Sequence, residues 1–207
     1  MRHRKQGTWL MTGGLLLMAA ALLLTCYNLW DEHRADTLAA GTLEELRAEM
    51  PVQEEQTAPE APGEEVIPDY LLDPGREMPA VEIGGEDYIG MLEIPALGLE
   101  LPVMGEWSYP RLRKAPCRYR GSAYQGDLII AAHNYRSHFG GLKSLGPGGE
   151  VRFTDMDGNV FCFAVAETEM LDGTAVEAME AGDWDLTLFT CTPGGKARVT
   201  VRCVLEQ

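Results

Sequence analysis

The N-terminal part of the chain contains one long apolar run. No charged residue lies between residues 7 and 30, and Leu10–Leu24 is almost wholly apolar. About 20 apolar residues are enough for a helix to span a bilayer, so residues 1–30 are expected to hold a transmembrane segment. Three basic residues precede the run and acidic residues follow it. This asymmetry predicts a cytoplasmic N-terminus and an exported remainder.

A cleaved signal peptide is the alternative to a permanent anchor. Its apolar region is usually only about 7–15 residues long and ends at a small-x-small cleavage site. The residues that follow Leu24 are Thr-Cys-Tyr-Asn and offer no such site. The sequence therefore favours an uncleaved, single-pass anchor in the cell membrane.

Residues 31–80 have the composition of an extracellular spacer. They hold 14 acidic against 3 basic residues, and prolines stand among Glu and Gln, as in extended linkers. Thr42, followed by Leu-Glu-Glu, has capping-box character and predicts a short helix within residues 31–50. The more apolar segment Tyr70–Gly75 has two interpretations. It is either a linker end that packs on the next domain or a plug over an active site.

Residues 81–207 alternate between short apolar runs and turn residues, which predicts an all-β sandwich or barrel. Met-Asp-Gly-Asn at 156–159 predicts a hairpin turn, because Gly and Asn tolerate positive φ. The best candidate for a helix inside this domain is Leu171–Ala181. The expected strands are Tyr88–Ile94, Asp127–Ala132, Glu150–Thr154, Val160–Ala166, Asp185–Thr190 and Arg198–Leu205.

Charge and length narrow the class of protein. The 207 residues include 17 basic and 32 acidic side chains, for a net charge of −15. A phosphate backbone would be repelled by this excess of acid, which argues against nucleic-acid binding. The length allows one domain of ordinary size plus appendages, and the 45% hydrophobic content is enough for a packed core.

The first candidate for chemistry is Cys191, at the end of an apolar strand and before a Pro-Gly-Gly turn. In an antiparallel hairpin, Arg198 lies across from Cys191 or Thr190. A guanidinium beside a thiol favours the nucleophilic thiolate, and it can also donate hydrogen bonds to an oxyanion. Arg202 is a rival on the same face, but it lies roughly 13 Å farther along the strand. We therefore prefer Arg198.

The second candidate is His133. The apolar run of residues 128–132 predicts a strand that ends just before this imidazole. Catalytic groups are often found in such loops, where a rigid strand fixes their position. Cys, His and Arg together make a plausible site for a thiol transferase or a thiol peptidase.

These residues resemble the motifs of the sortases, the membrane-anchored cysteine transpeptidases of Gram-positive bacteria. Thr187–Cys191 matches the Thr-Leu-x-Thr-Cys signature of that family. Ile89–Pro95 resembles its entry strands, and Gly126–Asn134 resembles the segment that leads to its catalytic histidine. Arg198 fits the arginine on the strand after the cysteine. The resemblance covers about residues 88–205, with the motifs in family order.

The resemblance implies a closed eight-stranded β-barrel with short helices and a two-step transfer. Cys191 would attack a peptide carbonyl in a C-terminal sorting motif similar to Leu-Pro-x-Thr-Gly, and an amine of a cell-wall precursor or a pilin would resolve the thioacyl intermediate. His133 would move protons and Arg198 would stabilise the oxyanion. Thr190 and Asn134 would contact the substrate. The implied partners are proteins with a sorting signal and an amine acceptor, with no cofactor.

Other functions and sites stay open at this point. The competing functions are a thiol peptidase that mainly hydrolyses and a non-catalytic, membrane-tethered β-domain that binds peptides.

His138 lies near His133, but no metal site is expected because a helical His-Glu-x-x-His and paired cysteines are absent. Spacing does not reveal whether Cys117, Cys162 and Cys203 form a disulfide. The short stretch between residues 167 and 185 argues against the large helical insertion of class B sortases, and the sortase class stays open.

Overall fold

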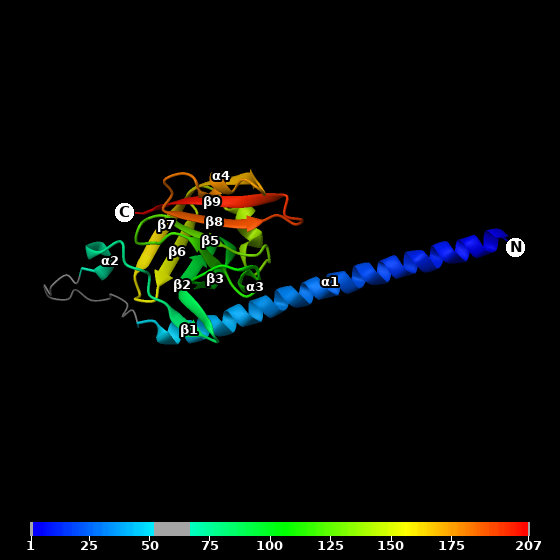
Figure 1. Cartoon of the computed structure of the whole chain (residues 1–207), viewed down its shortest axis with the longest axis horizontal. Helices are drawn as coiled ribbons and strands as arrows, with labels where there is room; N and C mark the ends of the chain where they lie inside the picture. Colours follow the sequence, from blue (N-terminus) through cyan, green and yellow to red (C-terminus); the bar gives the residue numbers. More distant parts are fainter. Residues whose placement is uncertain (1, 52–66, 207) are drawn as a thin grey trace.

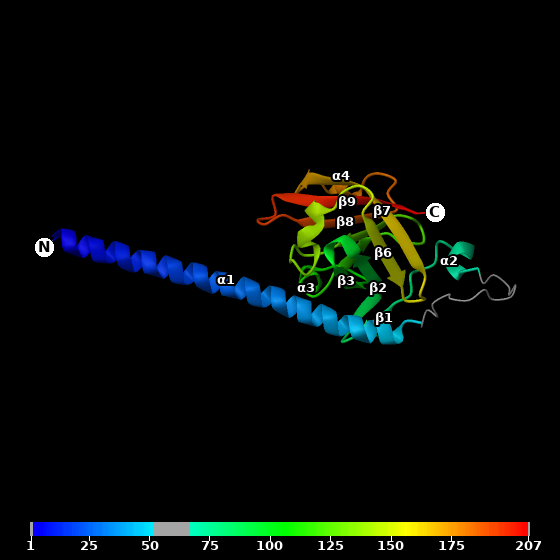
Figure 2. The ribbon, with the colours of Figure 1, turned by 180° about the vertical axis from the view of Figure 1, so that it is seen from behind.

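A long helix leads into a β-barrel in the computed structural model (Figure 1). The structure describes residues 2–51 and 67–206, without the side chains of residues 2–8 and 10. Helix α1 spans Arg2–Glu49, and its first half projects far from the rest of the molecule. Seen from behind, the same helix passes along the barrel next to β1 (Figure 2).

Nine strands form one sheet in the order β1-β2-β3-β4-β5-β8-β9-β7-β6. β2 also pairs with β6, so the eight strands β2 to β9 close into a ring, and β1 forms a hairpin with the start of β2 outside it. The closed eight-stranded barrel expected from the sequence is therefore confirmed. The strands are β1 (Val81–Ile83), β2 (Glu86–Ile94), β3 (Leu99–Met104), β4 (Cys117–Arg120), β5 (Leu128–Ala131), β6 (Glu150–Asp155), β7 (Val160–Asp172), β8 (Leu186–Cys191) and β9 (Ala197–Leu205).

Closure of the ring depends on a glycine in β2. Gly90 pairs with Val103 of β3 and with Asp155 of β6. A Cβ atom added at Gly90 would lie 2.1 Å from the carbonyl oxygen of Thr154, and its φ of +153° is rare for other residues. Only a residue without a side chain allows β6 to approach β2 this closely.

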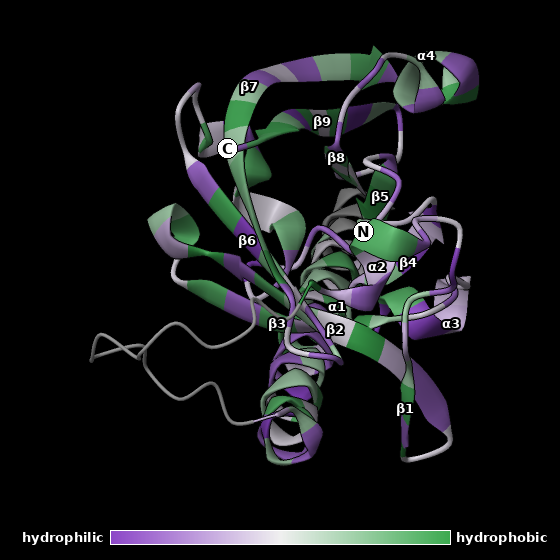
Figure 3. Cartoon of the chain, turned by 90° about the vertical axis from the view of Figure 1, so that its left-hand side faces the viewer, coloured by the Kyte–Doolittle hydropathy of each residue, from purple (hydrophilic) through white to green (hydrophobic). Residues whose placement is uncertain are grey.

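The interior of the barrel follows the alternation of the strands. Hydrophobic and hydrophilic residues alternate along β6 (Figure 3), and the hydrophobic ones face the core. Leu188 of β8 and Val201 of β9 are paired across the ladder, and both are fully buried in this core. The predicted hairpin at residues 156–159 joins β6 to β7, and Gly158 has a φ of +84° there.

One predicted helix begins later than expected. β7 continues to Asp172, because its residues pair with β9 as far as Asp172 and Ala197. In the expected helix Leu171–Ala181, the first two residues are strand, residues 173–175 connect, and Val176–Glu180 are helical. At Leu171 and Asp172 the pairing with β9 outweighs the local helix propensity. The short helices are α2 (Asp69–Leu72), η1 (Pro95–Leu97), α3 (Tyr109–Leu112), η2 (Phe139–Ser144) and α4 (Val176–Glu180).

The second half of α1 packs on the barrel. Ala35, Ala39, Leu43 and Leu46 are buried at helical spacing, and α1 contacts β1, β2 and β3. The capping-box sequence at Thr42 does not begin a helix, since α1 runs through it without interruption. The division of the chain at residues 30 and 80 stays a prediction, to which the structure adds that residues 31–49 are helical and partly packed.

The first half of α1 is exposed and apolar. It is the one helix among the described residues that is long and apolar enough to cross a membrane, by length and composition, and its apolar window has no buried residue. The large hydrophobic side chains of this half, such as Leu16 and Leu23, are more than half exposed. Exposed apolar surface of this extent is typical of a membrane-spanning helix and also of a signal sequence.

The segment before β1 packs against the barrel. The ring of Tyr70 stacks on Tyr124 at a centroid distance of 4.9 Å and lies 5.2 Å from Phe161. Leu71 and Leu72 point to solvent. None of residues 67–75 lines the pocket that contains Cys191. The structure therefore agrees with a packed linker end and not with a plug.

Leu46→Ala tests the packing of α1. Leu46 is fully buried with Tyr88, Met104 and Cys117, so its truncation is expected to lower the free energy of unfolding by about 2–4 kcal/mol. Leu38→Ala on the same helix is the matched control. Leu38 is 43% exposed, and its truncation should cost less than about 1 kcal/mol. The measurement is chemical unfolding of the full chain in mild detergent. Equal losses in the two variants would show that the helix is not docked.

Candidate active site

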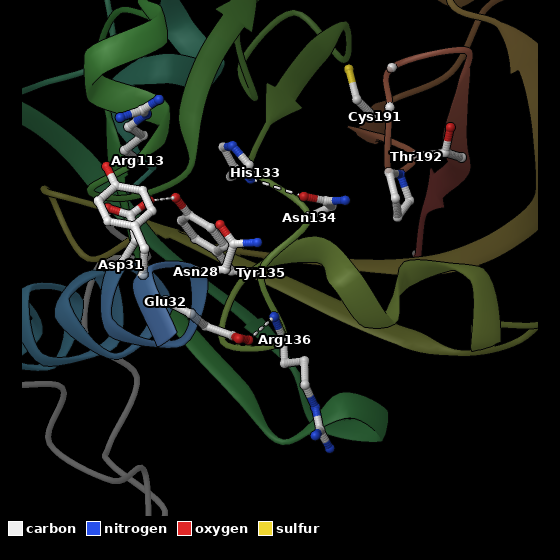
Figure 4. Close-up of a pocket in the computed structure, with 14 residues that line it drawn as sticks. Asn28, Asp31, Glu32, Arg113, His133, Asn134, Tyr135, Arg136, Cys191 and Thr192 are labelled. Atoms are coloured by element: carbon white, nitrogen blue, oxygen red, sulfur yellow. Dashed lines mark hydrogen bonds between the residues drawn. The ribbon is translucent and has the colours of Figure 1, made fainter. Parts of the chain in front are cut away.

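Cys191 and His133 lie at the ends of two neighbouring strands. β5 and β8 are parallel, with Ala131 paired to Phe189. Cys191 and His133 each lie two residues beyond this pair, so both side chains extend from the same face of the sheet. They line one pocket of about 580 Å³ (Figure 4). Parallel pairing thus brings together two residues that are 58 positions apart.

Thr190 links the ends of β5 and β8 on the opposite face of the sheet from Cys191. Its hydroxyl donates a hydrogen bond of 2.8 Å to the carbonyl of Ala132, and the amide of Ala132 donates to the carbonyl of Phe189. Thr190 is 3% exposed and does not line the pocket. Its hydroxyl joins the strand ends that carry Cys191 and His133, and its predicted contact with substrate stays a prediction.

Arg198 lies directly across the ladder from Cys191. Directly paired residues share a face, and the guanidinium lies 5.7 Å from the centre of the Phe189 ring. Its Nε and Nη1 are buried and have no hydrogen-bond partner among the described residues. A buried N–H without a partner is costly. These donors are therefore available to an oxygen that enters from the site, although Arg198 itself does not line the pocket.

Arg202 lies on the same face, but its surroundings give it a structural role. Its side chain is 3% exposed and forms a 2.9 Å ion pair with Glu169. It also donates to the carbonyls of Ala178 and Met179 in α4, both at 2.7 Å. These bonds hold α4 over the outer face of the sheet. The preference for Arg198 over Arg202 therefore agrees with the hydrogen bonds of the two guanidinium groups.

The ring of His133 is held by its neighbours. Its Nδ1 lies 3.0 Å from Oδ1 of Asn134, and its face stacks on Tyr135 at 4.1 Å with an angle of 12°. With an amide oxygen at Nδ1, that nitrogen carries the proton and Nε2 is free to exchange one. Burial lowers the pKa of His133 below its ordinary value of 6.5, which favours neutral imidazole at pH 7.

Asn134 lies at the pocket, whereas His138 is buried outside its lining. Asn134 lines the pocket beside His133, and its predicted contact with substrate stays a prediction. His138 is fully buried, and burial lowers its pKa to about 4. Within the described parts of the chain, no three His, Cys, Asp or Glu side chains are grouped to hold a metal ion. The five cysteines are all free.

The opposite wall of the pocket comes from a part of the chain that the sequence did not connect with the site. Tyr27, Asn28, Asp31 and Glu32 of α1 line the pocket together with Arg113. Figure 4 shows the carboxylates of Asp31 and Glu32 directed toward the loop after His133. Residues 27–32 showed only the end of an apolar run, and no motif linked them to residues about 100 positions later.

Residues 111–120 contain five basic side chains, and three of them form ion pairs. Glu86 accepts hydrogen bonds of 2.7 Å from Arg111 and from Lys114, and these bonds lower the pKa of Glu86. Arg120 forms a 2.7 Å ion pair with Glu180. A cluster that is paired in this way presents little free positive charge to a partner.

Comparison with known proteins identifies one matching family model. The family model described as the Sortase domain matches residues 92–206, more than half of the chain. No curated protein sequence matches the chain.

Solved structures with a similar fold include three sortases. A sortase D5 transpeptidase of Clostridium perfringens has 20% identity and a TM-score of 0.58, over 83% of this chain and 99% of that one. Sortase A of Corynebacterium diphtheriae has 18% identity and a TM-score of 0.54, over 59% of this chain and 62% of that one. The chain thus spans less than two thirds of that sortase A. Sortase C of Clostridium perfringens, solved with the C-terminal cell wall sorting motif, has 20% identity and a TM-score of 0.51, over 59% and 72%.

Arg202→Met tests the assignment of the two arginines. It leaves Glu169 and two carbonyls of α4 without their donor, and the free energy of unfolding should fall by about 2–4 kcal/mol. Arg120→Met is the matched control, because its ion pair with Glu180 is 65% exposed on the arginine side and should contribute less than about 1 kcal/mol. Chemical unfolding of the full chain in detergent measures both. If Arg202→Met costs no more than the control, Arg202 does not hold α4.

Proposed function

The chain belongs to the sortase family, and from this premise we propose that it cleaves a C-terminal sorting motif and transfers the acyl part to an amine. Members of this family are cysteine transpeptidases. The proposal is carried above all by one observation, the pocket that Cys191 and His133 share at the ends of two parallel strands. It names Cys191 as the nucleophile, His133 as the general acid and base, and Arg198 as the oxyanion donor.

The first half-reaction acylates Cys191. Neutral His133 takes the proton of the Cys191 thiol, and the resulting thiolate attacks the carbonyl carbon of the scissile peptide bond while the carbonyl electrons move to oxygen. The free N–H groups of Arg198 stabilise this oxyanion. The tetrahedral intermediate collapses when the C–N bond breaks, and Nε2 of protonated His133 gives its proton to the leaving amine. The products are a thioester on Cys191 and a released C-terminal peptide.

The second half-reaction transfers the acyl group. An acceptor amine attacks the thioester carbon, and neutral His133 takes the proton from its nitrogen. Collapse of the intermediate breaks the C–S bond and restores the Cys191 thiolate. The result is a new amide bond. Water can replace the amine, so hydrolysis is the expected side reaction.

The substrates follow from the same chemistry. We propose that the donor is a protein with a C-terminal motif resembling Leu-Pro-x-Thr-Gly, and that the acceptor is an amine of a cell-wall precursor or of a pilin. A sortase C with a similar fold was solved with the C-terminal cell wall sorting motif, which supports the choice of donor. Asn134, and Thr190 through the strand ends, would orient this peptide.

The location follows from α1. We propose that the apolar half of α1 crosses the cell membrane with its N-terminus in the cytoplasm and the barrel outside. The charge asymmetry around residues 7–30 supports this orientation, and the exposed apolar surface of the helix supports the span.

A ligation assay tests the proposed reaction. The full chain in detergent is incubated with peptides that contain Leu-Pro-x-Thr-Gly-like motifs and with a mixture of amines, and the products are identified by mass spectrometry. We expect a thioacyl adduct on Cys191 and amine-dependent ligation. Cys191→Ala should lower turnover at least about a thousandfold, and Arg198→Lys about a hundredfold. Cys162→Ala is the matched control, because Cys162 lies in β7 outside the pocket.

Three results would contradict the proposal. Hydrolysis without ligation at any amine concentration would indicate a peptidase. Binding without an adduct would indicate a peptide-binding domain. Equal activity of Cys191→Ala and the unchanged chain would remove Cys191 as the nucleophile.

A labelling experiment tests the orientation. Cys26 and Cys191 are exposed and Cys162 is partly exposed, whereas Cys117 and Cys203 are buried. In a Cys26→Ala background, a membrane-impermeant maleimide added to intact cells should therefore label the chain, and further replacement of Cys162 and Cys191 by alanine should abolish the reaction. Labelling that appears only after the cells are lysed would place the barrel in the cytoplasm.

A further inference from the structure

Two consecutive residues of α1 bind the loop that carries His133. Oδ2 of Asp31 accepts a 2.5 Å hydrogen bond from the hydroxyl of Tyr135. Oε1 of Glu32 accepts a 2.7 Å hydrogen bond from the backbone amide of Arg136. Each contact joins residues 104 positions apart, and both are visible in Figure 4. The anchor helix is thus bonded to the site itself, beyond its packing on β1, β2 and β3.

Tyr135 also contacts His133 and so links it to α1. The Tyr135 ring stacks on the His133 ring with 4.1 Å between centroids and 12° between planes, and it lies 5.5 Å from the His138 ring. Asn134 holds the edge of the His133 ring at Nδ1. The imidazole is therefore held at one edge by Asn134 and on one face by Tyr135. The position of the Tyr135 ring depends in turn on the carboxylate of Asp31.

The position of Asp31 is fixed by packing farther along α1. Ala35 and Ala39 lie one and two turns after Asp31, and their exposed fractions are 1% and 4%. Small side chains let the helix approach the barrel closely. Leu46 anchors the end of the same face in the core. A carboxylate on a helix that is held at several turns loses little freedom when it binds Tyr135.

We propose that Asp31 is a positioning residue that acts through Tyr135 on His133, so that the membrane-anchor helix completes the active site. The inference rests on the proposed role of His133 as general acid and base. Asp31 does not touch the reacting atoms. It holds the ring whose Nε2 must meet the leaving and the incoming amine, and small displacements of such a group are costly.

The charges around His133 predict the sign of a pH effect. The groups that face it are Asp31 from α1, Arg113 from the segment after α3, Tyr135 and His138 from its own loop, and Cys191 from β8. Burial and Arg113 lower the pKa of His133, and the hydrogen bond to Asn134 and the charge of Asp31 raise it. Removal of the Asp31 charge should therefore lower the pKa of His133 further.

The first test is a double-mutant cycle in the full chain in detergent. Asp31→Asn and Tyr135→Phe both weaken the same contact, and Tyr135→Phe keeps the ring that stacks on His133. We expect each to lower kcat about 5- to 50-fold with little change in KM. The double variant should be no slower than the slower single variant, because both act through one contact. Tyr135→Ala, which also removes the ring, should lower kcat further.

Asp36→Asn is the matched control. Asp36 lies on the same helix, carries the same charge and is exposed to solvent, so kcat and the pH profile should be unchanged. Thermal unfolding of all variants shows whether the fold is retained. Additive losses in the cycle, a change in KM alone, or an equal loss in Asp36→Asn would overturn the proposal.

A second measurement does not need turnover. Nuclear magnetic resonance of ¹⁵N-labelled histidine in the substrate-free chain gives the titration midpoint of His133, and Asp31→Asn should lower it relative to Asp36→Asn. An unchanged midpoint overturns the positioning role, whatever the activity. Absence of turnover on every peptide, together with a lowered midpoint, would instead overturn the proposed reaction and support the contact from Asp31 to His133.

Discussion

The parallel pairing of β5 with β8 is the constraint on which the candidate site depends. Neighbouring parallel strands end at the same edge, so the residues just beyond Ala131 and Phe189 must lie together. Such pairing is stable where both faces are covered. All four residues of β5 are buried, because the barrel core covers one face and Met179 and Phe189 pack with Ile129 and Ala131 on the other. The continuous apolar run before His133 is therefore the consequence of a strand buried on two sides.

Arg198 and Arg202 lie four residues apart on one face of β9, and their neighbours give them different roles. Arg202 has an ion-pair partner and three hydrogen-bond acceptors, which are two carbonyls of α4 and the hydroxyl of Thr187. Arg198 has an aromatic ring beneath it and unused donors beside Cys191. The first is satisfied by the fold, and the second has capacity left for a substrate oxygen. An arginine side chain thus holds α4 in place at position 202, and lies opposite Cys191 at position 198.

The sequence predicted the parts of this site that depend on local pattern. Strand alternation and turn residues indicated the barrel, and the Pro-Gly-Gly turn after Cys191 indicated that Arg198 lies opposite. The helix expected at Leu171–Ala181 begins only at Val176, because Leu171 and Asp172 pair with β9, and this nonlocal contact is not contained in local propensity. The docking of α1 could not be predicted either. Ala35 and Ala39 lie among acidic residues as in a spacer, and their burial becomes apparent only when the surface of β1, β2 and β3 is present.

The docked helix also sets where the site lies relative to the proposed membrane. The uncharged run ends at Trp30, and Asp31, the next residue, already touches the loop of His133. Tyr27 belongs to the run and lines the pocket, and tyrosine is favoured at the membrane interface. One helix turn covers only about 5.4 Å, so a span that ends near Trp30 holds the pocket at the level of the lipid headgroups. Donor and acceptor would therefore meet Cys191 at the membrane surface, where a substrate that is itself attached to the membrane is already concentrated.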